Sequence, residues 1–172
     1  MNAVKAGNID QMGLLFERHH RNLFGFFYNL TQQASHSEDL VQAVFYRMMK
    51  YKHNFRGEGQ FTTWMYSIAR NVWIDEGKKS KHPHEELNDH EHLMADYSNR
   101  ESRWEEDEEQ QKLRLALQRL DEEQREVLVM SKLQQMKYQQ IAHILNCSEG
   151  NVKVKVFRAM KALKEVFHQL PL

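Results

Sequence analysis

Residues 138–165, YQQIAHILNCSEGNVKVKVFRAMKALKE, contain the strongest structural signal in the sequence. An apolar segment ending at Leu145 is followed by a three-residue turn, residues 146–148, and then by a longer amphipathic segment. Ser148 is a typical N-cap residue, because its side chain can accept a hydrogen bond from the backbone amides of the first helical turn. Two helices joined by so short a turn predict a helix-turn-helix.

The second helix of this motif has one apolar stripe and one basic face. We expect the stripe to pack on the preceding helix through six residues: Val152, Val156, Ala159, Leu163, Ile141 and Leu145. Lys153, Lys155 and Arg158 lie away from the stripe, on a face that the major groove of DNA could receive. A helical hairpin with a solvated lysine face is the alternative interpretation. The cap, the turn length and the charge together favour DNA binding.

The composition excludes several other classes of protein. A chain of 172 residues with 7 Gly and 2 Pro favours a mostly helical protein of one large or two small domains. No apolar run is long enough to cross a bilayer, and the first ten residues lack a signal-peptide pattern. We therefore expect a cytoplasmic protein without membrane insertion. The single Cys147 excludes an intrachain disulfide and a cysteine-rich zinc site.

Charge is distributed unevenly along a chain whose formal net charge is zero. Residues 1–81 hold 11 Lys and Arg against 7 Asp and Glu, and residues 127–172 hold 7 against 2. The intervening residues 82–126 hold 6 basic and 15 acidic side chains. Two cationic ends joined by an acidic segment indicate that both ends meet a polyanion.

Helical periodicity divides the chain into three parts and predicts an all-α fold of two small helical domains. Residues 1–81 contain three strong helical segments, and Ser35 with Glu38 suggests a capping box at the start of the second. Residues 82–109 are acidic and lack periodic apolar positions, which predicts a flexible linker. Residues 110–172 form the predicted helix-turn-helix domain, in which Asp121 with Gln124 suggests another capping box.

Aromatic and basic residues are concentrated in residues 61–81, FTTWMYSIARNVWIDEGKKSK. One face carries apolar residues that we expect in the core: Phe61, Trp64, Met65, Ile68 and Val72. Tyr66, Arg70 and Trp73 lie on a different stripe, which Lys78 and Lys79 continue. Exposed rings beside cations suit a single nucleic-acid strand, because rings stack on unpaired bases while cations follow the phosphates. The alternative is burial of both rings of the stripe against other helices.

Three stretches, taken in order, resemble the extracytoplasmic-function (ECF) sigma factors, the small two-domain initiation subunits of bacterial RNA polymerase. DLVQAVFYRM, residues 39–48, resembles the polymerase-binding helix of that family. FRGEGQFTTWMYSIARNVWID, residues 55–75, is similar to the helix and loop that hold the melted minus-ten element. Residues 120–163 resemble the domain that reads the minus-thirty-five element. The resemblance covers nearly everything outside the linker.

The resemblance implies roles for individual positions. It implies polymerase contacts for Asp39, Gln42 and Phe45. It places Asn71 where the family captures a base flipped from the minus-ten strand, beside the stripe of Tyr66, Arg70, Trp73, Lys78 and Lys79. It assigns contacts with the minus-thirty-five duplex to Lys153, Val154, Phe157 and Arg158. Three further residues lie at the start of the same helix: Ser148, Asn151 and Lys155. The resemblance places Ser131 and Lys132 near the phosphates of this duplex.

Four positions depart from the family pattern. Ala43 replaces an acidic residue of the polymerase-binding helix. Gln135 and Lys137 stand where a Gly and a capping Ser are common, so the entry to the helix-turn-helix is less ideal. Val154 replaces a frequent Ser, which favours contact with a thymine methyl group and should alter the promoters that are read.

The sequence therefore predicts a non-catalytic sigma factor, without cofactor or metal, that binds core RNA polymerase and promoter DNA and directs transcription initiation. One alternative is a helix-turn-helix regulator that acts on duplex DNA without polymerase. Another is a metal-dependent hydrolase built on the linker histidines His82, His84, His90 and His92. Their flexible setting offers no preformed metal geometry, and no catalytic constellation accompanies them. The resemblance also implies an anti-sigma partner, which no stretch identifies.

Overall fold

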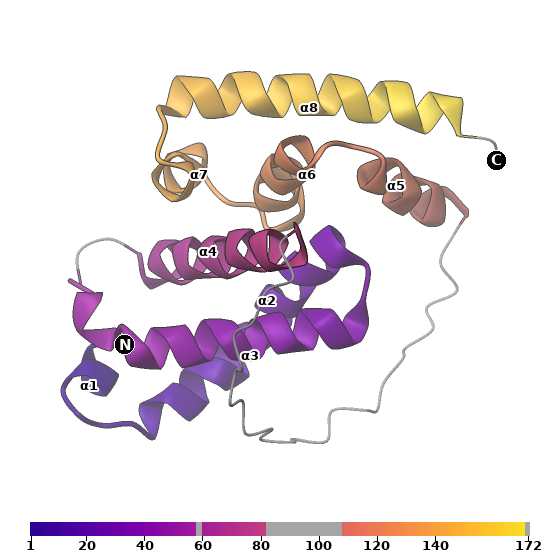
Figure 1. Cartoon of the computed structure of the whole chain (residues 1–172). Helices are drawn as coiled ribbons and strands as arrows, with labels where there is room; N and C mark the ends of the chain where they lie inside the picture. The colour runs from indigo at the N-terminus through magenta and orange to yellow at the C-terminus, as the bar shows by residue number, and fades with distance from the viewer. Residues whose placement is uncertain (58–59, 82–107, 171–172) are drawn as a thin grey trace.

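The computed structural model describes residues 1–57, 60–81 and 108–170, which form helices joined by turns, with no strand among them. The N-terminal lobe contains α1 (Asn2–Lys5), α2 (Gln11–Thr31), α3 (Ala34–Lys50), the 3-10 helix η1 (Lys52–Asn54) and α4 (Phe61–Lys81). The C-terminal lobe contains α5 (Glu108–Gln118), α6 (Glu122–Leu128), the π-helical turn η2 (Val129–Leu133), α7 (Tyr138–Leu145) and α8 (Glu149–Gln169). The predicted all-α fold with two helical units is confirmed (Figure 1). The four linker histidines lie outside the described residues.

The start of α3 differs from the sequence-based expectation. Gln33 occupies the N-cap position and Ser35 lies inside the first turn, so the capping box of Ser35 and Glu38 is not formed. Local hydrogen bonds place the start earlier, because Thr31 Oγ1 accepts from the Gln33 backbone amide at 3.1 Å. The buried Ser37 hydroxyl then donates to the Gln33 carbonyl at 2.7 Å, which satisfies a polar group inside the lobe.

The caps predicted for the C-terminal lobe are present. Asp121 accepts a hydrogen bond from the Gln124 backbone amide at 2.7 Å and begins α6. Ser148 accepts from the Asn151 amide at 3.2 Å and begins α8. Asn146 ends α7 in the left-handed conformation, with φ of 51°, so residues 146–148 turn the chain directly from α7 into α8. The predicted helix-turn-helix is confirmed.

The apolar stripe of α8 packs as expected. Val152, Val156 and Ala159 are buried, Leu163 is half-buried, and α8 lies against α7 with its buried Ile141. The face opposite this stripe is left at the surface of the C-terminal lobe, on the outer side of the molecule in Figure 1.

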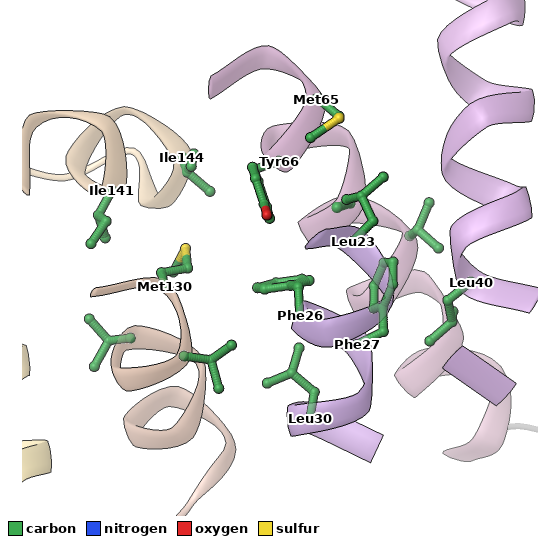
Figure 2. Close-up of a cluster of buried hydrophobic side chains, with 14 of the residues drawn as sticks. Leu23, Phe26, Phe27, Leu30, Leu40, Met65, Tyr66, Met130, Ile141 and Ile144 are labelled. Atoms are coloured by element: carbon green, nitrogen blue, oxygen red, sulfur yellow. The ribbon is translucent and has the colours of Figure 1, made fainter. Parts of the chain in front are cut away.

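The two lobes share one hydrophobic core, which the sequence did not indicate. α4 lies between the α2–α3 pair and α7, while η2 packs against α2 (Figure 1). Figure 2 shows Met130, Ile141 and Ile144 of the C-terminal lobe facing Tyr66 and Phe26 of the N-terminal lobe. All five side chains are buried. Their contact holds the helix-turn-helix domain against the N-terminal lobe on the side that presents α4.

Gly25 of α2 lies beside the C-terminal lobe. A Cβ atom added to Gly25 would lie 3.8 Å from Gln134 Nε2, at the end of η2. A methyl group would make ordinary van der Waals contact there, whereas a larger side chain would meet Gln134. The absence of a side chain at Gly25 therefore leaves space beside Gln134 that alanine would also fit. Gly13, on the same helix, has nothing within 4 Å of its added Cβ.

Candidate nucleic-acid interface

The residues expected to bind polymerase lie on α3, but they differ in accessibility. Asp39 and Gln42 are exposed on the outer face of the helix. Phe45 is 7% exposed, and its ring makes an edge contact with Phe16 at 4.9 Å between centroids. Phe45 is therefore mainly a core residue of the N-terminal lobe, and the available polar surface of α3 is provided by the other two.

The expected exposure of Tyr66 on α4 is wrong for this structure. Its side chain is 5% exposed, and its hydroxyl donates a hydrogen bond to Gln134 Oε1 at 2.8 Å. Burial raises the pKa of Tyr66, so the hydroxyl stays protonated and remains a donor. The physical reason is tertiary. Met130 of η2 faces the ring (Figure 2), Gln134 directly after η2 accepts the hydrogen bond of the hydroxyl, and Phe26 of α2 makes an edge contact with the ring at 5.4 Å between centroids.

Arg70 is also engaged by the C-terminal lobe. Its Nε atom lies 2.8 Å from Oε1 of Glu126, whose side chain is 8% exposed, while that of Arg70 is 27% exposed. Burial raises the pKa of Glu126, and the charge of Arg70 acts in the opposite direction. The carboxylate is thus held inside the protein at a cost that the guanidinium offsets only in part.

Trp73 completes the stripe and lies at the edge of the same contact. It is half-buried, and its Nε1 atom is buried without a hydrogen-bond partner. A pocket of about 420 Å³ opens beside it between the lobes, lined by Arg70, Trp73, Ile74, Gly77, Lys78, Glu122, Glu123, Glu126, Leu145 and Lys155. The three central residues predicted to face an unpaired strand therefore face the C-terminal lobe.

The remaining minus-ten candidates are placed differently. Asn71 is exposed on α4, as is Lys78. Lys79 belongs to α4, but its side chain lies outside the described part of the structure. The predicted strand-binding surface is thus split, because Asn71 faces solvent while the aromatic stripe is covered.

On α8 the predicted residues form one exposed face. Val154 is 47% and Phe157 is 72% exposed, and Lys153 and Arg158 are exposed beside them. These four side chains project from the first half of the helix, where a recognition helix contacts base edges. Exposed valine and phenylalanine side chains can contact thymine methyl groups, and the cations can bind phosphates or guanine.

Other residues expected near the minus-thirty-five duplex have structural partners. Ser148 and Asn151 form the cap of α8. Lys155 pairs with Glu123 of α6 within the same lobe. The Ser131 hydroxyl donates a hydrogen bond to the Val127 carbonyl at 2.7 Å, whereas the side chain of Lys132 is exposed.

Sequence reasoning missed the residues that join the lobes. Gln140 Nε2 donates to Thr63 Oγ1 at 3.3 Å and also contacts Gln60. Arg125 Nη1 donates to the Leu30 carbonyl at 3.1 Å while its other nitrogens bind carbonyls within its own lobe. One signal was present in the sequence: Glu126 is a charged residue that immediately precedes the apolar run VLVM, residues 127–130.

Two further properties bear on the kind of site. Across the described residues, no group of three or more His, Cys, Asp or Glu is placed to hold a metal ion. None of the helices in those same ranges combines the length and the apolar character that a membrane span requires.

The fold is that of a two-lobed helical protein whose C-terminal lobe contains a helix-turn-helix with an exposed basic face on α8. Residues 15–82 match the family described as Sigma-70 region 2, and residues 110–163 match Sigma-70, region 4. The chain therefore belongs to the sigma-70 family. A helix-turn-helix regulator without polymerase binding would not need the region 2 match, so that alternative is disfavoured.

Relatives identify the type of sigma factor. The chain is 28% identical to the ECF RNA polymerase sigma factor SigX of Bacillus subtilis, over 88% of this chain and 81% of that protein. It is 25% identical to the RNA polymerase sigma-H factor of Pseudomonas aeruginosa, over 97% and 91% of the two chains. The sequence-based identification as an ECF-type sigma factor is confirmed, so the protein binds core RNA polymerase and promoter DNA and directs transcription initiation.

Solved structures confirm the fold. CnrH, in complex with the cytosolic domain of CnrY, superposes with a TM-score of 0.75 at 20% identity, over 99% of this chain and 96% of CnrH. The sigma factor RpoE of Bartonella quintana, in complex with the anti-sigma factor NepR, has a TM-score of 0.70 at 22% identity, over 92% and 97%.

Proposed function

We propose that this sigma factor divides promoter recognition between its two lobes. The C-terminal lobe reads the minus-thirty-five duplex through Lys153, Val154, Phe157 and Arg158, and the N-terminal lobe holds the melted minus-ten strand at Asn71. Asp39 and Gln42 of α3 contact core polymerase. The protein acts in the cytoplasm as a non-catalytic subunit.

The exposed face of α8 is the observation that carries this proposal. A phenylalanine that is 72% exposed contributes little to the core of a small lobe, and it stands between exposed cations on a capped helix. Such a face pairs apolar groups for base edges with cations for the phosphate backbone. Phosphate contacts also predict a binding affinity that falls steeply with salt.

Asn71 supports the second half of the proposal. Its side chain is exposed on α4 and carries both donors and an acceptor, which can bind the edge of a flipped base. Flipping costs a few kcal/mol, which the hydrogen bonds of such a site recover.

The test is transcription in vitro with core polymerase and a promoter library. We expect Asn71→Ala to reduce promoter opening, measured as permanganate-reactive thymines, while pull-down of core polymerase stays unchanged. Asp75→Asn is a matched control on the same helix, since Asp75 pairs with Arg47 at 2.7 Å within the N-terminal lobe. If Asn71→Ala reduces opening and polymerase binding together, Asn71 has a structural role and the assignment is wrong.

We also propose that an anti-sigma factor restrains this protein. The RpoE structure, which resembles this chain, is a complex with the anti-sigma factor NepR. A candidate that co-purifies with the full chain should abolish transcription when it is added back to the reconstituted system. Continued transcription at saturating amounts of the candidate would exclude it as the restraining partner.

A further inference from the structure

We propose that the short helix α1 positions the turn at residues 55–57, so that Arg56 of this turn meets the melted strand held at Asn71. Lys5 and Asn2 of α1 are then positioning residues for strand capture, although both lie outside α4. The inference rests on the proposed function, since it takes Asn71 as the residue that holds the strand.

The turn lies at one end of the side of α4 that presents Asn71. Trp64, Asn71 and Lys78 are spaced seven residues apart on this helix, so they share one side of it, and Asn71 is about 10 Å along the axis from Trp64. Asn71 and Lys78 are exposed, and Trp64 is half-buried. Phe55 packs on Trp64 with 5.2 Å between ring centroids. A strand that follows this side of α4 toward its start therefore reaches the turn.

Arg56 is an exposed cation between two residues whose positions are fixed. Phe55 is 7% exposed, because its ring lies against Phe61 and Trp64 of α4. Gly57 has a φ of 75°, a backbone conformation that residues with a side chain rarely adopt. A guanidinium group binds phosphate through hydrogen bonds of defined direction, so the contribution of Arg56 depends on where the turn holds its backbone.

α1 holds this turn through contacts of its own side chains. The Lys5 ammonium group donates a hydrogen bond to the Phe55 carbonyl at 2.9 Å. The Asn2 side chain lies beside Gly57, where an added Cβ atom would be 3.4 Å from Asn2 Oδ1. Val4 is fully buried and anchors α1, which packs against α2 and η1. α1 thus fixes a turn that lies 50 positions later in the sequence.

Lys5→Met tests the positioning role, because methionine keeps most of the length of the side chain and removes the donor. Lys5→Arg is the matched control, since arginine keeps a cationic donor. The probe is the Phe55 backbone amide, which donates to the Lys52 carbonyl at 3.3 Å. Its hydrogen exchange, measured by NMR in the free full chain, should be about fivefold faster in Lys5→Met and close to wild type in Lys5→Arg. An unchanged exchange rate in Lys5→Met overturns the proposal.

The functional measurement is promoter opening by the holoenzyme, followed as permanganate-reactive thymines. Lys5→Met should reduce opening about threefold, while pull-down of core polymerase and binding of minus-thirty-five duplex stay unchanged. Lys5→Arg should retain opening. Reduced opening without faster exchange at Phe55 would mean that Lys5 contacts the strand directly, which overturns its positioning role. Faster exchange with wild-type opening overturns it as well.

A double-mutant cycle tests whether Lys5 acts through Arg56. Arg56→Gln should reduce opening by itself, because it removes the cation that the turn presents. Lys5→Met should then cause no further loss in the Arg56→Gln background, since the group that it misplaces is already absent. Independent, additive losses from the two substitutions would show that Lys5 does not act through Arg56, and the proposal would be wrong.

The proposed function is tested separately from the role of α1. Asn71→Ala removes the group that holds the flipped base and leaves α1 and the turn in place. If Asn71→Ala leaves opening unchanged, the proposed function is wrong. If Asn71→Ala reduces opening and Lys5→Met does not, the proposed function stands and the positioning role of α1 is wrong.

Discussion

The two predicted recognition surfaces, on α8 and on α4, both carry basic and aromatic residues in the sequence, yet their accessibility differs in the structure. On α8 the predicted contact residues Phe157 and Arg158 are exposed. On α4 the predicted contact residues Tyr66 and Arg70 are engaged by the other lobe. Helical periodicity shows which residues share a face, but only the packing of the lobes decides whether that face meets water.

The largest expected effect tests this contrast with two aromatic residues. Tyr66→Ala should lower the free energy of unfolding by about 3–5 kcal/mol, because it removes a ring buried between the lobes. Phe157→Ala should change it by less than about 0.5 kcal/mol, because that ring is largely exposed. Urea unfolding followed by circular dichroism measures both. Equal decreases in the free energy of unfolding for the two variants would show that the difference in burial between Tyr66 and Phe157 does not determine their contributions to stability.

The second prediction concerns function on the exposed side. Arg158→Ala should weaken binding of the holoenzyme to minus-thirty-five DNA about tenfold, because it removes a cation from the recognition face of α8. Lys164→Ala, farther along the same exposed helix surface, is the control and should have a smaller effect. Electrophoretic mobility shifts at fixed salt give the ratio. Equal effects for both residues would indicate nonspecific charge rather than a recognition face.

The third prediction is that the free energy of unfolding depends on pH through Glu126, which pairs with Arg70 of α4. The pKa of Glu126 is raised in the folded protein, so the folded state holds this proton more readily than the unfolded state. Its contribution to stability is therefore full below the ordinary pKa of 4.5 and is lost as pH rises through the folded pKa. Glu126→Gln should make the free energy of unfolding, measured with urea, depend less on pH in this range. An unchanged profile would assign the dependence to other groups.

The smallest expected effect lies at the entry to the helix-turn-helix. Gln135 has a φ of 51°, a left-handed conformation that glycine adopts without strain. Gln135→Gly should therefore raise the free energy of unfolding, by at most about 1 kcal/mol, since glycine also increases the entropy of the unfolded chain. Thermal unfolding provides the comparison. A lower melting temperature would mean that the glutamine side chain contributes more than the backbone strain costs.

Local signals predicted the elements of this fold and the packing of α8 on α7, but not the packing of the two lobes on each other. Ser148 and Asp121 cap the helices they were expected to cap, since a cap depends on residues only three positions apart. The expected cap at Ser35 was wrong because Thr31 and the buried Ser37 organise that turn instead. Glu126 beside an apolar run was the one visible sign of a buried charge, but its partner Arg70 is remote in the sequence.

The sequence by itself determined the helices, the helix-turn-helix and the sigma factor class, because these follow from spacings and motifs within short segments. Only the tertiary structure decided that Tyr66, Arg70 and Trp73 lie against the C-terminal lobe while the face of α8 stays open. The physical reason is that contacts such as Tyr66 with Gln134 join residues 68 positions apart. Such contacts depend on how two apolar surfaces fit together, and no periodicity within either segment encodes that fit.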